Sequence, residues 1–133
     1  MMSVMPKKHR RDMEKEAERL KNEGCNISAF YTIFLTDMEI FVDNLTCNNN
    51  LVNKIRRLMS AFIEQGEENY DEACVWIAGF HLTCMKGLDA VKKAPESKKL
   101  KERHHARNRC YKLIGKFSED FEEKINEFVD NKK

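Results

Sequence analysis

Two short motifs in this sequence have residue types and spacings that suit metal binding. Glu102-x-x-His105 matches one half of the site in four-helix di-iron proteins, and His81-x-x-Cys84 places two zinc-ligand types on one helix face. A di-iron site needs a second such motif with further glutamates, and a structural zinc site needs four ligands. Glu102 also lies in the most basic part of the chain, where a cation is repelled. We therefore predict no metal site and no cofactor.

The same residues offer a weak case for catalysis. Cys84 with His81 could imitate a thiolate–imidazole pair, but both lie in the most apolar segment of the chain, and burial raises the pKa of a thiol. No two of the five glycines are close enough to form a phosphate-binding loop. The acidic runs fall on expected helix ends and loops rather than in a cleft. We predict no catalytic residues and expect that the protein is not an enzyme.

Cysteine usage indicates the cellular compartment. The five cysteines are odd in number and none belongs to a CxxC pair, so we expect reduced thiols that pack as small apolar residues. A basic run directly after the start interrupts any signal peptide. We predict an intracellular protein, cytoplasmic or nuclear. The cysteines are Cys25, Cys47, Cys74, Cys84 and Cys110.

Charge is sorted into blocks although the net charge is only +2. Residues 86–116 are strongly basic, residues 117–130 are strongly acidic, and Glu64 to Glu72 form a second acidic run. The basic block would neutralise nucleic-acid phosphates or meet an acidic protein, an anionic membrane or calmodulin. It could instead pair with the chain's own loop at Glu64 to Glu72. The residues predicted to carry an electrostatic partner are Lys98, Lys99, Lys101, Arg103, Arg107 and Arg109.

A second basic run lies near the start of the chain. Lys7, Lys8, Arg10 and Arg11 resemble a short nuclear-localisation run. Such runs also arise by chance in lysine-rich proteins, and this one merges into a charged helix.

Hydrophobic periodicity predicts an all-α fold, a single-domain bundle of four to five helices with a long C-terminal helix. We expect a flexible basic N-terminus over residues 1–12 and the bundle domain over residues 13–133. The first helix carries only a thin apolar stripe, so we expect it to be loosely attached. Acidic residues interrupt the longest apolar stretch, which excludes a membrane span there. Helices are expected at about 11–23, 27–45, 51–65, 70–93 and 95–129, with 27–45 and 70–93 at the centre.

The central helices carry more apolar residues than one bundle needs. Ile33, Leu35 and Ile40 form a second apolar flank, to which Trp76 or Phe80 could add. Surplus apolar surface is typical of an interface or of a groove for a partner helix. We therefore expect a non-catalytic intracellular adaptor or regulatory subunit that acts through protein–protein contacts. The alternatives are a nucleic-acid-associated protein that uses the basic block, and an accessory subunit of an enzyme complex; a homo-oligomer also stays open.

Overall fold

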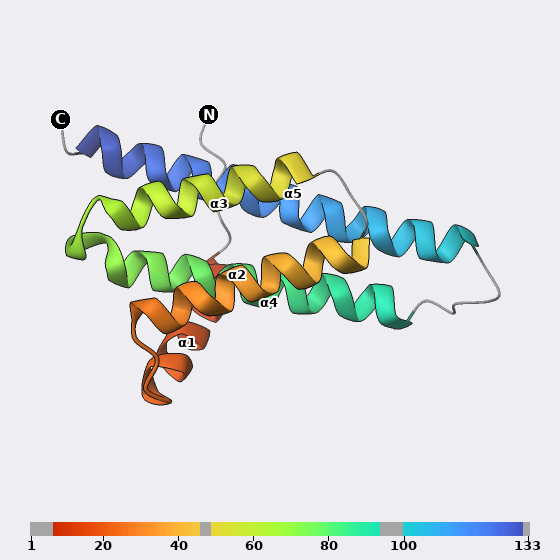
Figure 1. Cartoon of the computed structure of the whole chain (residues 1–133), viewed down its shortest axis with the longest axis horizontal. Coiled ribbons are helices and arrows are strands. Elements are labelled where there is room, and N and C mark those ends of the chain that lie inside the picture. Colours follow the sequence, from red (N-terminus) through yellow and green to blue (C-terminus); the bar gives the residue numbers. More distant parts are fainter. Residues whose placement is uncertain (1–6, 46–48, 94–99, 132–133) are drawn as a thin grey trace.

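The computed structural model describes the backbone of residues 7–45, 49–93 and 100–131. Within these ranges it also describes the side chains, except those of residues 41–45, 49, 88–93, 100–104, 106 and 129–131. The described residues fold as α-helices with one short 3₁₀ turn and contain no strand. The predicted all-α bundle with a long C-terminal helix is confirmed (Figure 1). The elements are α1 (Lys7–Asn22), α2 (Ile27–Leu45), α3 (Asn49–Glu64), η1 (Glu67–Asn69), α4 (Tyr70–Lys93) and α5 (Leu100–Asn131).

Helix α4 is the centre of the bundle. It packs most extensively against α5, α1 and α2, and less against α3. This position follows from its sequence, because a helix with apolar residues all round its surface must be covered on all sides. The predicted central place of this helix is therefore confirmed. Its buried apolar residues are Ala73, Cys74, Trp76, Ile77, Ala78, Phe80 and Cys84.

Aromatic rings join α4 directly to α2 and α5, and through α5 to α3. Phe34 of α2 lies 5.0 Å from Phe80 of α4 between ring centroids, and Phe80 lies 5.4 Å from Phe117 of α5. Trp76 contacts two rings of α5, at 5.5 Å from Phe117 and 5.3 Å from Phe121. Phe121 in turn lies 6.0 Å from Phe62 of α3 in an edge-to-face arrangement. These tilted geometries are the favoured ones for aromatic pairs, so one connected series of rings holds four helices.

Helix α1 differs from its prediction in both extent and attachment. It begins at Lys7 rather than near residue 11, so it includes residues that we had assigned to a flexible N-terminus. Its apolar stripe of Met13, Ala17 and Leu20 is buried, and α1 belongs to the packed bundle. Gly79 of α4 permits this close packing, because a Cβ there would lie 2.7 Å from Met13 Cε and 2.8 Å from Met13 Cγ. A narrow apolar stripe is therefore enough to attach α1, because the facing residue of α4, Gly79, has no side chain.

Gly24 and Asn26 act as the helix caps that their residue types favour, whereas Asn69 does not. Gly24 has a φ of 95° and closes α1, with hydrogen bonds from the amide of Gly24 to the Lys21 carbonyl and from that of Cys25 to the Leu20 carbonyl. Asn26 caps α2 by accepting a hydrogen bond from the Ala29 amide at 2.9 Å. Asn69 and Glu72 have the three-residue spacing of a capping pair at the start of α4, but the capping that this spacing predicts is wrong. The buried Asn69 donates through Nδ2 to the Phe62 carbonyl, and its Oδ1 accepts no hydrogen bond.

None of the described helices combines the length and the apolar character that crossing a bilayer requires.

Trp76 provides a test of this core, because its side chain is only 3% exposed. We expect Trp76→Ala to lower the free energy of unfolding by about 3 to 5 kcal/mol, the usual cost of removing a large buried aromatic side chain. Urea denaturation followed by circular dichroism measures this. Met85→Ala is the matched control, since Met85 lies on the same helix at 59% exposure and should change stability by less than about 0.5 kcal/mol. Equal effects of the two variants would place Trp76 outside the core.

Candidate functional site

The predicted apolar flank is only partly exposed. Leu35 and Ile40 each keep 40% of their surface accessible, whereas Ile33 packs partly against the core. Trp76 and Phe80 are buried, so the expectation that one of them extends an exposed surface is wrong. Ile33 and Ile40 are seven residues apart and share one helical face, while Leu35 lies on another side of α2. The flank is therefore not one continuous surface.

Leu35 instead belongs to a shallow groove between α2 and α3. It lines a hollow of about 470 Å³, and the hollow next to it, of about 530 Å³, shares Tyr31, Ser60 and Glu64. The hydroxyls of Tyr31 and Ser60 are 2.6 Å apart, and this hydrogen bond holds the two helices across the floor. We call this surface the α2–α3 groove. Its residues are Tyr31, Leu35, Arg56, Arg57, Ser60, Ala61 and Glu64.

Positive charge lies along the α3 side of the α2–α3 groove. Arg56 and Arg57 are exposed, and neither forms an ion pair with another described residue. Their neighbour Lys54 differs, because its Nζ lies 2.6 Å from Glu122 Oε2 of α5. The sequence placed both arginines on the outer face of this helix but gave no sign that they border a groove. That information lies in the packing of α2 against α3.

The predicted electrostatic site is described only in part. Lys98 and Lys99 lie outside the described residues, as do the side chains of Lys101 and Arg103. Of the remaining two, Arg107 is half-buried and Arg109 is exposed.

The basic start of α5 lies far from the acidic loop that was its alternative partner. In Figure 1 the first turns of α5 and the loop between α3 and α4 are at opposite ends of the bundle. Two carboxylates of that acidic run have nearer partners: Asp71 Oδ1 lies 2.9 Å from Lys21 Nζ, and Glu72 binds Arg10. The alternative that these charges pair with each other is therefore wrong for the described residues.

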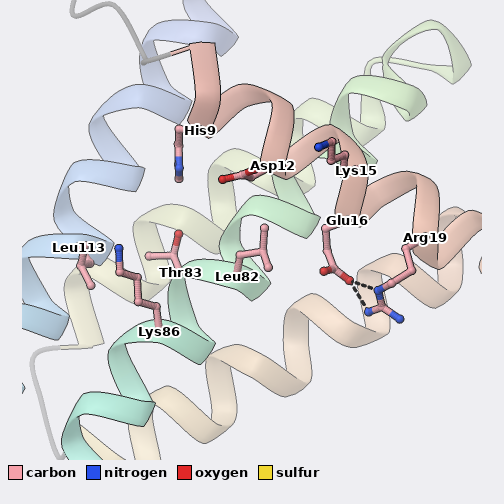
Figure 2. A pocket seen from close by; sticks show the side chains of 9 residues that line it. All are labelled: His9, Asp12, Lys15, Glu16, Arg19, Leu82, Thr83, Lys86 and Leu113. Atoms are coloured by element: carbon pink, nitrogen blue, oxygen red, sulfur yellow. Dashed lines mark hydrogen bonds and ion pairs between the residues drawn. The ribbon is translucent and has the colours of Figure 1, made fainter.

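A second concave surface lies where α1, α4 and α5 meet (Figure 2). It encloses about 560 Å³, and side chains from all three helices line it. We call it the α1–α4–α5 hollow. Sequence reasoning missed it, because its members come from segments far apart in the chain. Its lining residues are His9, Asp12, Lys15, Glu16, Arg19, Leu82, Thr83, Lys86 and Leu113.

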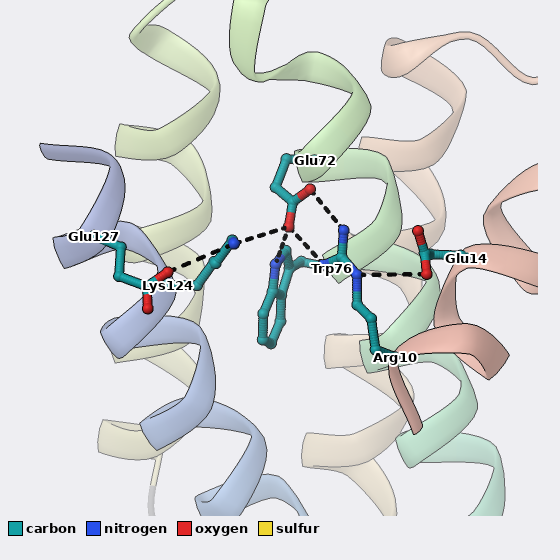
Figure 3. A network of polar contacts seen from close by, with 6 residues as sticks. All are labelled: Arg10, Glu14, Glu72, Trp76, Lys124 and Glu127. Atoms are coloured by element: carbon teal, nitrogen blue, oxygen red, sulfur yellow. Dashed lines mark hydrogen bonds and ion pairs between the residues drawn. The ribbon is translucent and has the colours of Figure 1, made fainter. Parts of the chain in front are cut away.

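A polar network joins the same three helices near the first turn of α4 (Figure 3). Arg10 of α1 binds Glu72 of α4 through two hydrogen bonds, from Nη1 to Oε1 at 2.6 Å and from Nη2 to Oε2 at 2.8 Å. The Trp76 indole donates to Glu72 Oε1 at 3.1 Å, and Lys124 of α5 lies 3.9 Å from the same oxygen. Such a two-pronged arginine–carboxylate pair fixes orientation as well as charge.

The charges of this network support each other. Burial alone would raise the pKa of Glu72, but the hydrogen bonds and charge of Arg10, with Lys124 and Trp76, outweigh it, and the pKa falls below its ordinary value. The hydrogen bonds to Glu72 likewise raise the pKa of Arg10. Arg10 is thus engaged within the fold, whereas Lys7, Lys8 and Arg11 of the proposed localisation run are exposed.

The His81-x-x-Cys84 motif has a structural role. His81 Nδ1 lies 2.7 Å from Oδ2 of Asp37, a largely buried residue of α2. Hydrogen bonding to Asp37 raises the pKa of His81, against the opposing effect of burial. Burial raises the pKa of the Cys84 thiol, which makes it a poor nucleophile.

Among the described side chains, no three His, Cys, Asp or Glu residues are grouped as a metal site. Cys25, Cys74, Cys84 and Cys110 form no disulfide with one another, and Cys47 lies outside the described residues.

Comparison with known proteins gives no family for this chain. It matches no protein-family model, and no curated protein and no solved structure is significantly similar to it.

The His81–Asp37 pair predicts how stability depends on pH. Because the folded-state pKa of His81 is raised, its contribution is complete below the ordinary value of about 6.5 and is lost as pH rises through the raised value. We expect wild type to lose stability over this range relative to His81→Gln, which cannot titrate there. Urea denaturation of both proteins at several pH values from 5.5 to 9 measures this. Parallel pH profiles would contradict the assignment.

Proposed function

We propose that the protein is a non-catalytic adaptor or regulatory subunit that binds a helix of a partner protein in the α2–α3 groove. The observation that carries this proposal is the exposed Leu35 beside Arg56 and Arg57, which have no ion-pair partner among the described residues. A single exposed leucine is ordinary on a protein surface, but Leu35 lies in a groove beside two arginines, a residue type that is enriched at protein–protein interfaces.

The chemistry of the groove defines the partner. Its floor is formed by Tyr31, Leu35 and Ala61, which suit the apolar stripe of an amphipathic helix. Arg56 and Arg57 favour glutamates or aspartates on the adjoining flank of that helix, since arginine binds carboxylates through paired donors. Glu64 at the other end of the groove would repel acidic residues there and so set the direction of the bound helix. The expected partner is an amphipathic helix that is acidic along one part.

The engagement of polar side chains supports a non-catalytic role. Glu72 and His81 are the described groups whose surroundings most resemble a reactive site, and each binds an oppositely charged residue of a neighbouring helix. An intracellular location belongs to the same proposal, whereas an accessory subunit of an enzyme complex is an alternative to it.

A second candidate function is nucleic-acid binding by the basic start of α5. Its distance from the acidic loop favours this, because the positive charge is not neutralised by that loop. Arg109 is exposed within the same segment. Binding there would be salt-sensitive and largely independent of base sequence.

The groove proposal can be tested by mutation and affinity purification. We expect Leu35→Asp to abolish recovery of a nuclease-resistant partner that wild type retains, because the new carboxylate prevents apolar packing and repels an acidic helix. Arg57→Glu should weaken recovery at least tenfold, and Met85→Asp on α4 is the matched exposed control that should leave it unchanged. Sedimentation of the purified protein distinguishes a second copy as partner. Equal recovery by all four proteins would refute the groove.

The second candidate has a separate test. Lys99→Glu, Arg103→Glu and Arg109→Glu together should abolish salt-sensitive binding to a labelled single-stranded oligonucleotide, measured by fluorescence anisotropy. Arg109 is chosen over Arg107 because Arg107 is half-buried and its Nε is enclosed. The fold should persist, as judged by an unchanged circular dichroism spectrum. Wild-type protein that fails to bind the oligonucleotide at low salt would exclude this function.

A further inference from the structure

We propose that the α1–α4–α5 hollow binds a small organic phosphate, a phosphate group carried on an apolar body. This site is separate from the α2–α3 groove, shares no residue with it and does not depend on the function proposed there. Its volume of about 560 Å³ lies within the range of pockets that hold small ligands.

The floor of the hollow is apolar. Leu82 of α4 and Leu113 of α5 are half-buried and line it, so each keeps part of its surface open to the space between the helices. Thr83 is buried between them, and its hydroxyl donates to the Gly79 carbonyl at 2.8 Å. The Thr83 hydroxyl therefore cannot also donate a hydrogen bond to an anion. This floor suits an apolar or aromatic group rather than a charged one.

Cationic side chains border the same space. His9 of α1 and Lys86 of α4 extend into it from its two sides, and Lys15 lies at its rim (Figure 2). No described residue forms an ion pair with any of the three. An anion can bridge two donors on facing helices, because it accepts a hydrogen bond from the Lys86 ammonium and one from a ring N–H of His9.

Acidic side chains limit the charge that the hollow can accept. Glu16 accepts a hydrogen bond from Arg19 Nε at 2.6 Å, so this pair is largely neutral. Asp12 has no such partner among the described residues and opposes an anion from the α1 side. The two positive charges of Lys15 and Lys86 outweigh the negative charge of Asp12 by only one unit, so the hollow favours one phosphate group over a polyanion.

The surroundings add positive potential. Lys8 and Arg11 line a further hollow of about 390 Å³ along α1, together with Asp12 and Lys15. On α5, Arg109 is one helical turn before Leu113 and is exposed. Two basic stretches that are distant in sequence thus flank one concave surface, and their summed field attracts anions to it.

Isothermal titration with 1-naphthyl phosphate tests the proposal, with inorganic phosphate and 1-naphthol as partial ligands. We expect the ester to bind at least tenfold more tightly than either part. Lys86→Ala and His9→Ala should each weaken binding about fivefold or more, and Asp12→Asn should strengthen it at least twofold. Lys112→Ala is the matched control, because Lys112 is exposed on α5 but does not line the hollow, and it should change affinity by less than twofold.

Two further arms identify the source of the phosphate and the competing explanation. Binding to vesicles that contain phosphatidic acid, but not to pure phosphatidylcholine vesicles, and competition by 1-naphthyl phosphate would identify a lipid headgroup. Absence of vesicle binding with retained affinity for the ester would indicate a free metabolite. The proposal is overturned if the ester binds no better than inorganic phosphate, or if Asp12→Asn weakens binding. It is also overturned if an oligonucleotide displaces the ester equally well from wild type and from Lys86→Ala, because the ester would then be bound to a general basic surface and not by Lys86.

Discussion

The burial of α4 is the constraint on which the rest of the structure depends. A polar group that is buried against neighbouring helices needs a partner, because desolvating an unpaired charge costs several kcal/mol. The partly buried Glu72 and His81 accordingly bind residues of the neighbouring helices, whereas Lys86 lies on an exposed side of α4. Glu72 binds Arg10 of α1 and lies near Lys124 of α5, and His81 binds Asp37 of α2. These pairs join α4 to α1, α2 and α5, and the aromatic contacts also pack α4 against α2 and α5.

Much of this fold could be predicted from the sequence, because helical periodicity is a local property. The apolar series from Ile27 to Leu45 and the nearly all-apolar α4 predicted two central helices. Only α4 has that place, because α2 packs mainly against α4 and only slightly against α3. The attachment of α1 could not be predicted in the same way. It depends on Gly79 facing Met13, and on Arg10 reaching Glu72 across 62 residues of sequence. Neither the Gly79–Met13 contact nor the Arg10–Glu72 pair produces a periodic pattern in the sequence.

The candidate sites were harder to predict than the fold for a related reason. Leu35 was identified as surplus apolar surface, but no pattern in the sequence indicated that Arg56 and Arg57 lie beside it. Whether two helices enclose a groove depends on the size of the residues between them. Here the Tyr31–Ser60 hydrogen bond joins the two helices within the groove. The hollow at Lys86 and Leu113 needs three helices at once, so no single segment could indicate it.

The order of the helices along the chain has a consequence for synthesis on the ribosome. Helix α1 emerges first, but its binding surface is on α4, and the residues that join them are 62 positions apart. At bacterial and eukaryotic elongation rates of about 5 to 20 residues per second, this separation corresponds to roughly 3 to 12 seconds. A helix of 16 residues is marginally stable alone in water. Its many charges keep the nascent segment hydrated during that delay, and its three buried apolar residues offer little for a wrong partner to bind.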